Sequence, residues 1–140
     1  MNKKIWSIAL VLFAICAAGT IFAQSKGQSP EELIKRAKDL ASVYENLERN
    51  TRLSPKAQAS SYSEENRERF QENIENNLIK QSRKLEDDSS RLSTDLAYAG
   101  YNLTYGNNKA WTDQQNRDLM DAIRRIDNAK SQTFRNISRW

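Results

Sequence analysis

The spacing of apolar residues constrains the fold of this 140-residue chain more than any other feature. Leu33, Leu40 and Leu47 recur every seven residues, with small or aromatic residues between them. Two later segments keep a spacing of three and four: first Phe70, Ile74, Leu78, Leu85, Leu92, Leu96, Ala99 and Leu103, then Leu119, Ile123, Ile126, Phe134, Ile137 and Trp140. Such residues share one face of an α-helix, and no segment alternates as a half-buried strand would. The sequence therefore predicts an all-α protein of three or four helices, arranged as a small bundle or a long helical hairpin.

The first and last helices have clear start signals. Ser29-Pro30-Glu31-Glu32 places a preferred capping residue before a proline, with a glutamate that can close a capping box. Thr112-Asp113-Gln114-Gln115 offers a second capping box with an acidic residue in the first turn. We expect helices to begin at both places, and Leu53-Ser54-Pro55 to end or interrupt the first one.

The middle of the chain is harder to divide. Residues 54–63 predict a linker, and a new helix is expected to start after Ser61 or Ser63. Its apolar spacing continues to Tyr105, and Gly106-Asn107-Asn108 predicts the stop because glycine and asparagine tolerate the left-handed conformation. Polar residues at 87–90 mark the place for a break. The sequence leaves open whether residues 63–105 form one helix or two.

Residues 1–23 resemble a secretory signal. Lys3 and Lys4 precede an apolar run, and small residues lead to a cleavage point near Ala23. We expect cleavage there, a polar tail at 24–28, a single helical domain at 29–140, and a periplasmic or secreted protein of bacterial type with no stable membrane insertion. The alternatives are an uncleaved anchor and lipidation at Cys16, against which stands the bulky Ile15 before the cysteine.

Composition excludes most catalytic chemistry after residue 23. That part of the chain has no cysteine and no histidine, so it lacks thiolate nucleophiles, imidazole bases and the usual zinc ligands. We expect no enzyme, no metal site and no cofactor. The remote alternative is glycan cleavage by two carboxylates. Acidic and basic residues are interspersed, with a net charge of about +2 once Lys3 and Lys4 are removed, so we expect no nucleic-acid partner.

The apolar core is thin, because Leu, Ile, Val and Phe together make up about a sixth of residues 24–140. A lean, periodic chain is typical of long helices with narrow seams, which a partner subunit often completes. Homo-oligomerisation, with dimerisation completing the bundle, is therefore a hypothesis from the sequence.

Aromatic residues gather near the predicted stop. Tyr98, Tyr101 and Tyr105 are spaced to share one helix face, and Trp111 follows the turn. Tyrosine and tryptophan are common in binding hot spots, so these four residues are candidates for a partner-binding surface. The alternative is that the rings only fill the end of the bundle.

The segment Trp111-Thr112-Asp113-Gln114-Gln115 resembles the Leu-Thr-x-x-Gln motif of the Spy/CpxP family of small periplasmic helical proteins. Thr112 and Gln115 match the motif, while Trp111 stands in place of the leucine, and a capping box alone also gives this pattern. The resemblance implies an ATP-independent, dimeric chaperone that holds unfolded clients.

The leading hypothesis from the sequence is an exported, non-enzymatic protein that binds a partner protein in the cell envelope or at the cell surface. The chaperone is the alternative.

Overall fold

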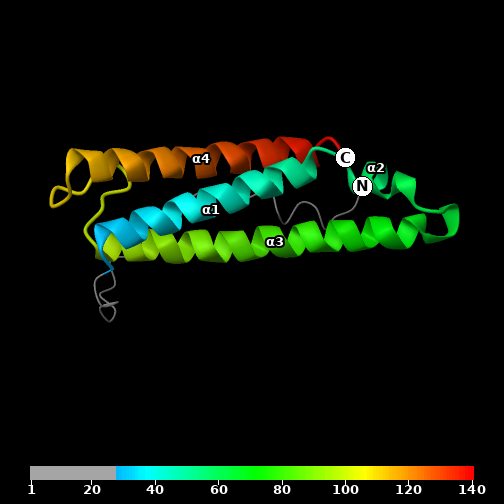
Figure 1. Cartoon of the computed structure of the whole chain (residues 1–140), viewed down its shortest axis with the longest axis horizontal. Helices are drawn as coiled ribbons and strands as arrows, with labels where there is room; N and C mark the ends of the chain where they lie inside the picture. Colours follow the sequence, from blue (N-terminus) through cyan, green and yellow to red (C-terminus); the bar gives the residue numbers. More distant parts are fainter. Residues whose placement is uncertain (1–27) are drawn as a thin grey trace.

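The computed structural model describes residues 28–140 and confirms the all-α fold (Figure 1). Its helices are α1 (Pro30–Thr51), α2 (Pro55–Gln58), the short 3-10 helix η2 (Ala59–Ser61), α3 (Glu64–Tyr98) and α4 (Asp113–Ile137). No strand forms within this range, where one isolated bridge joins Asn102 and Asn107. The predicted leader, its cleavage point at Ala23 and Cys16 lie outside the described residues.

Both predicted capping boxes are present. The Ser29 hydroxyl accepts a hydrogen bond from the Glu32 amide at 3.2 Å, and the Glu32 carboxylate accepts one from the Ser29 amide at 3.3 Å. At the start of α4, Thr112 and Gln115 make the same reciprocal pair at 3.1 and 2.9 Å. Each box satisfies two backbone donors that a helix start would otherwise leave without partners.

The predicted linker at 54–63 is wrong in part, because most of it is helical. Ser54 caps α2, which η2 extends, and Pro55 and Ala59 are buried where this segment packs against α3. The helix that follows starts after Ser63, one of the two expected places.

Helix α3 is continuous through residues 87–90, which settles the open question in favour of one helix. Ser89 is buried within it, because a small hydroxyl side chain fits the seam where a charged one would not. The predicted end at Tyr105 is wrong: α3 ends at Tyr98, and Gly100 turns the chain with a φ of +87°. Glycine adopts this left-handed conformation without the steric cost that other residues meet.

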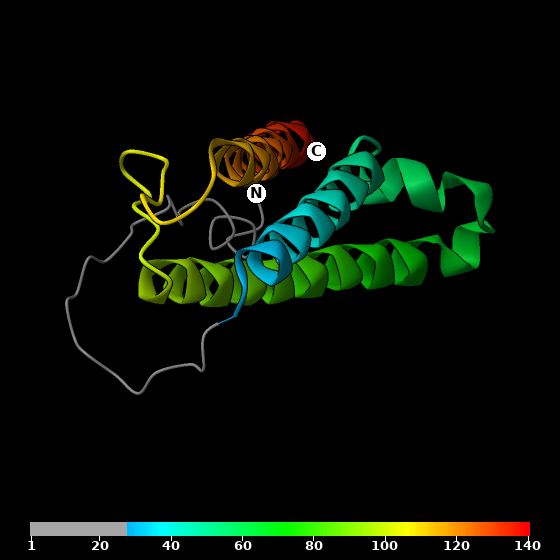
Figure 2. The ribbon, with the colours of Figure 1, turned by 60° about the vertical axis from the view of Figure 1, so that its left-hand side comes forward.

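Helix α1 lies between α3 and α4 in both views of the ribbon (Figures 1 and 2). It packs more extensively against α4, where both helices contribute buried alanines that let the backbones approach closely. Each of these three helices has one row of buried positions that alternate in steps of three and four, as in coiled coils. These rows are Leu33, Ala37, Leu40, Tyr44, Leu47 and Thr51 in α1; Leu78, Ser82, Leu85, Ser89, Leu92 and Leu96 in α3; and Leu119, Ala122, Ile126, Ala129, Thr133 and Asn136 in α4. Ile137 is also buried in α4, and α1, which lies between the other two helices, buries a second row at Ile34, Ala41 and Glu48.

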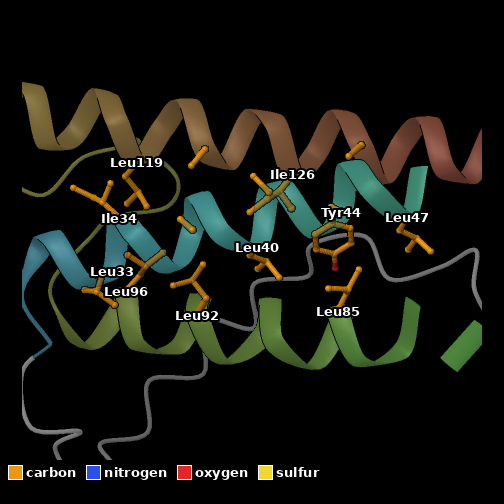
Figure 3. Close-up of a cluster of buried hydrophobic side chains, with 14 of the residues drawn as sticks. Leu33, Ile34, Leu40, Tyr44, Leu47, Leu85, Leu92, Leu96, Leu119 and Ile126 are labelled. Atoms are coloured by element: carbon orange, nitrogen blue, oxygen red, sulfur yellow. The ribbon is translucent and has the colours of Figure 1, made fainter. Parts of the chain in front are cut away.

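The apolar side chains of these seams meet in one core (Figure 3). Trp140 packs against it, as expected. Phe134, which the sequence places on the buried stripe of the last helix, is 49% exposed, so that assignment is wrong. Thr133 and Asn136 occupy the seam instead, because they form the true continuation of the three-and-four register.

Helix α3 extends well beyond the end of α1. It has 35 residues against 22 in α1, a difference of about 20 Å at 1.5 Å per residue. The side chains of residues 64–69 are exposed there, while Tyr62 stacks on Phe70 with 3.7 Å between ring centroids. None of the helices in residues 28–140 is both long and apolar enough to cross a membrane.

Candidate functional site

The structure divides the four predicted aromatic residues into two pairs. Tyr98, the last residue of α3, is 46% exposed, and Tyr105 in the loop after it is 78% exposed. Tyr101 is only 4% exposed, and Trp111 is half-buried. The prediction that the three tyrosines share one helix face is wrong, because the helix ends before Tyr101 and the chain turns at Gly100.

Tyr101 and Trp111 pack against each other beneath the loop. Their ring centroids are 5.6 Å apart at an angle of 43°, and both rings join the hydrophobic core. Burial raises the pKa of the Tyr101 phenol, because the ionised form loses its hydration there. For this pair the space-filling interpretation holds, and these rings support the loop from below.

The loop that carries Tyr105 is closed on itself by Asn102. The Asn102 amide donates to the Asn107 carbonyl at 2.7 Å, and the Asn102 carbonyl accepts from the Gly106 amide at 2.8 Å. The Asn102 side-chain oxygen accepts from the backbone amides of Thr104 and Tyr105 at 2.9 and 3.0 Å. These bonds fix the backbone on both sides of Tyr105 and hold its ring at the exposed tip.

A second asparagine anchors the loop to the bundle. Asn108 is buried, and its side-chain amide donates to the Ala99 carbonyl at 2.8 Å while its side-chain oxygen accepts from the Ala110 amide at 3.0 Å. Its backbone exchanges two hydrogen bonds with the Asn116 side chain, at 2.8 and 3.0 Å. The sequence suggested only a helix stop here; the recurrence of asparagine at 102, 107, 108 and 116 was the signal for a hydrogen-bonded loop.

The two motif positions at the start of α4 lie next to this loop in sequence. Thr112 and Gln115 form the capping box, and the Gln115 side chain also donates to the Glu31 carboxylate at 2.7 Å. This bond joins the first turn of α4 to the first turn of α1. Thr112 therefore caps α4 where the loop ends, and Gln115 also ties this helix start to that of α1.

A polar cluster lies at the other end of the α1–α4 pair. Glu48 is buried, and the pKa of its carboxyl is lowered. The hydrogen bonds from Arg52 are the largest cause; burial acts in the opposite direction, and the hydrogen bond from Asn136 lowers the pKa further. A shallow hollow of about 290 Å³ next to it is lined by Glu48, Arg52, Glu45 and Arg125, which already pair with one another. Within residues 28–140 no group of three acidic side chains could hold a metal ion.

The aromatic loop, defined as residues 98–111, is therefore the best candidate for a functional surface, with Tyr105 as its most exposed ring. Comparisons with family models, with curated proteins and with solved structures find no match for this chain.

Proposed function

We propose that this protein is an exported, non-enzymatic helical protein that binds a partner protein through the aromatic loop. Tyr105 is the principal contact residue, and Tyr98 contributes from the end of α3. The observation that supports this is a ring that is 78% exposed on a backbone fixed by hydrogen bonds on both sides.

A fixed loop lowers the entropic cost of binding. Ordering a mobile side chain or loop at an interface costs about 0.5–1.5 kcal/mol per side chain, and a preorganised contact avoids part of this. Tyrosine adds a large apolar ring with a polar tip, which suits the centre of a protein interface.

The experiment is a crosslinking pull-down of the tagged protein from its native envelope, compared with Tyr105→Ala and Phe134→Ala. Phe134 is the matched control because it is also a half-exposed aromatic residue, on α4. We expect one dominant partner that Tyr105→Ala loses and Phe134→Ala keeps, with unchanged far-ultraviolet circular dichroism in both variants.

Two other outcomes would overturn the proposal. Equal recovery of the partner by Tyr105→Ala would remove the aromatic loop as the binding surface. A broad set of unfolded proteins, retained by both variants, would point to the chaperone alternative, which would then have to suppress aggregation of several unrelated clients at near-stoichiometric ratio.

A further inference from the structure

Helices α1 and α4 are tied together along their whole length. Their backbones approach closely at buried alanines, and polar contacts join the two helices at the start, the middle and the end of the pair. These contacts are Gln115 with Glu31 and Arg125 with Glu45, both at 2.7 Å, and Asn136 with the Glu48 carbonyl at 3.2 Å and with the Thr51 hydroxyl at 3.1 Å.

Helix α3 is held to this pair by a thinner contact. It packs less extensively against α1 than α4 does, and two of the six buried positions among its 35 residues are the serines 82 and 89. A serine buries less apolar area than the leucine that such a seam favours, so it stabilises the contact less. Asp95 pairs with Arg36 of α1 at 2.6 Å, and Ser89 accepts a long hydrogen bond of 3.4 Å from Lys130 of α4.

The segments on either side of α3 divide between α3 and α4. The short helices α2 and η2 pack against α3 and therefore belong with it. At the other end Gly100 turns the chain, and the aromatic loop beyond this turn is hydrogen-bonded to α4 through Asn108 and Asn116. The bond from the Asn108 side chain to the Ala99 carbonyl crosses this boundary, so it breaks when α3 moves away.

We propose that α2, η2 and α3 separate as one unit from the α1–α4 pair, which stays packed, so that this protein has an open state in which the seam between α1 and α3 is exposed. Proteins open in cooperative segments, and segments with few buried apolar contacts open at the smallest cost in free energy. Figure 3 shows Leu40 between the two helices with Leu85 and Leu92 below it on α3; opening uncovers these side chains.

This opening is distinct from binding at the aromatic loop. Tyr105 stays with α4, because the hydrogen bonds between Asn108 and Asn116 do not involve α3. The open state therefore gives the protein a second apolar surface, which is covered whenever α3 is closed.

Native-state hydrogen exchange tests the opening. A detached helix with few apolar contacts is marginal in water, so its amides exchange in the open state. We expect the amides of α3 to exchange about tenfold faster, or more, than the most protected amides of α1 and α4. Equal protection in the three helices would overturn the proposal.

Two variants distinguish this opening from unfolding of the whole chain. Asn136→Ala weakens a contact that the open state keeps, so exchange should become about tenfold faster in α1 and α4 and stay unchanged in α3. Leu92→Ala weakens the seam that opening breaks, so exchange should become faster in all three helices. Exchange in α3 that follows α1 and α4 in Asn136→Ala, or that does not respond to Leu92→Ala, would overturn the proposal.

Thiol labelling tests the exposure of the seam itself. In a Cys16→Ser background, Ser82→Cys places a thiol in the α3 seam, and Ala129→Cys places a similarly buried thiol on α4 as the matched control. We expect a small thiol reagent to label Ser82→Cys about tenfold faster, or more, because its position is released without separating α1 from α4. Equal labelling rates would show that the seam opens only when the whole bundle unfolds, and the proposal would be wrong.

Discussion

Asn136 forms the main polar connection between the carboxyl ends of α1 and α4. It is only 8% exposed, and its side-chain amide donates to the Glu48 carbonyl at 3.2 Å, the Glu48 carboxylate at 3.3 Å and the Thr51 hydroxyl at 3.1 Å. Trp140 completes the contact by donating from its indole nitrogen to the Thr51 carbonyl at 3.0 Å. We expect Asn136→Ala to destabilise the protein by separating these two helix ends.

The loss of unfolding free energy in Asn136→Ala can be estimated from the hydrogen bonds that its partners keep. The Thr51 hydroxyl still donates to the Glu48 carbonyl at 2.7 Å, and Arg52 still binds the carboxylate at 3.0 Å, so no acceptor is left without a partner. The side-chain amide of Asn136 has two hydrogens for its three acceptors, and Gln132, which donates to the Asn136 side-chain oxygen at 3.0 Å, is only half-buried and can turn to water. The loss is then about two hydrogen bonds, one of them to a charged group, or about 2.5 kcal/mol. Alanine regains about 0.6 kcal/mol of helix propensity over asparagine. The expected net cost is about 2 kcal/mol.

Urea unfolding followed by circular dichroism at 222 nm measures this cost. With an m value of about 1.5 kcal/mol per molar, the midpoint should fall by about 1.3 M. The matched control is Asn128→Ala, an exposed asparagine on the same helix, which should raise stability by about 0.6 kcal/mol. If the unfolding free energies of the two variants lie within 0.5 kcal/mol of each other, the hydrogen bonds of Asn136 contribute nothing to stability and the reasoning is refuted.

The pH dependence gives an independent check on the same contact. The lowered pKa of Glu48 stabilises the fold above its unfolded value of 4.5, and this stability is lost as the pH falls through the folded value. Asn136 supplies part of that lowering, after Arg52. The difference in unfolding free energy between the native protein and Asn136→Ala should therefore narrow as the pH falls below 4.5, and a difference that widens there would contradict this assignment.

Three further predictions concern the core, the loop and the buried phenol. Leu119→Ala removes a fully buried side chain and should cost about 3–4 kcal/mol in urea unfolding, whereas Phe134→Ala should stay within about 0.5 kcal/mol. Gly106→Ala should lower the unfolding free energy by about 1–2 kcal/mol, because the φ of Gly106 is +70° and the new Cβ would lie 2.6 Å from the Met120 methyl group. A variant as stable as the native protein in urea unfolding would show that the loop adapts freely. Burial raises the pKa of Tyr44 above its usual value of 10, so stability should fall above pH 10 as the unfolded chain releases this proton first. In Tyr44→Phe that fall should be shallower by up to about 1.4 kcal/mol per pH unit, and equal slopes in alkaline urea titrations would disprove the assignment.

The helices and their starts could be predicted from local sequence, because their causes are local. Ser29 and Thr112 cap helices through residues three positions away, and the leucine heptads fix which face of each helix is apolar. These signals hold whatever the rest of the chain does. The end of α3 could not be placed this way, because both Gly100 and Gly106 can stop a helix and apolar spacing continues between them.

The candidate site was predicted only in composition. The sequence predicted that Tyr98, Tyr101, Tyr105 and Trp111 belong to the site. It also predicted that the three tyrosines share one helix face, but the helix ends at Tyr98. Which rings are buried depends on the turn at Gly100 and on packing: Tyr101 and Trp111 join a core to which α1, α3 and α4 contribute from distant parts of the chain.

By itself, the sequence determined that this protein is helical, where α1 and α4 begin, and which leucines form the core, since hydrogen bonds and periodicity within a few residues decide those features. Only the tertiary structure decided that Tyr101 is core while Tyr105 is exposed, and that Asn136 replaces Phe134 in the seam. Burial is a property of packing between segments: Asn136 meets Glu48 across 88 positions of the chain, a separation over which local patterns carry no information.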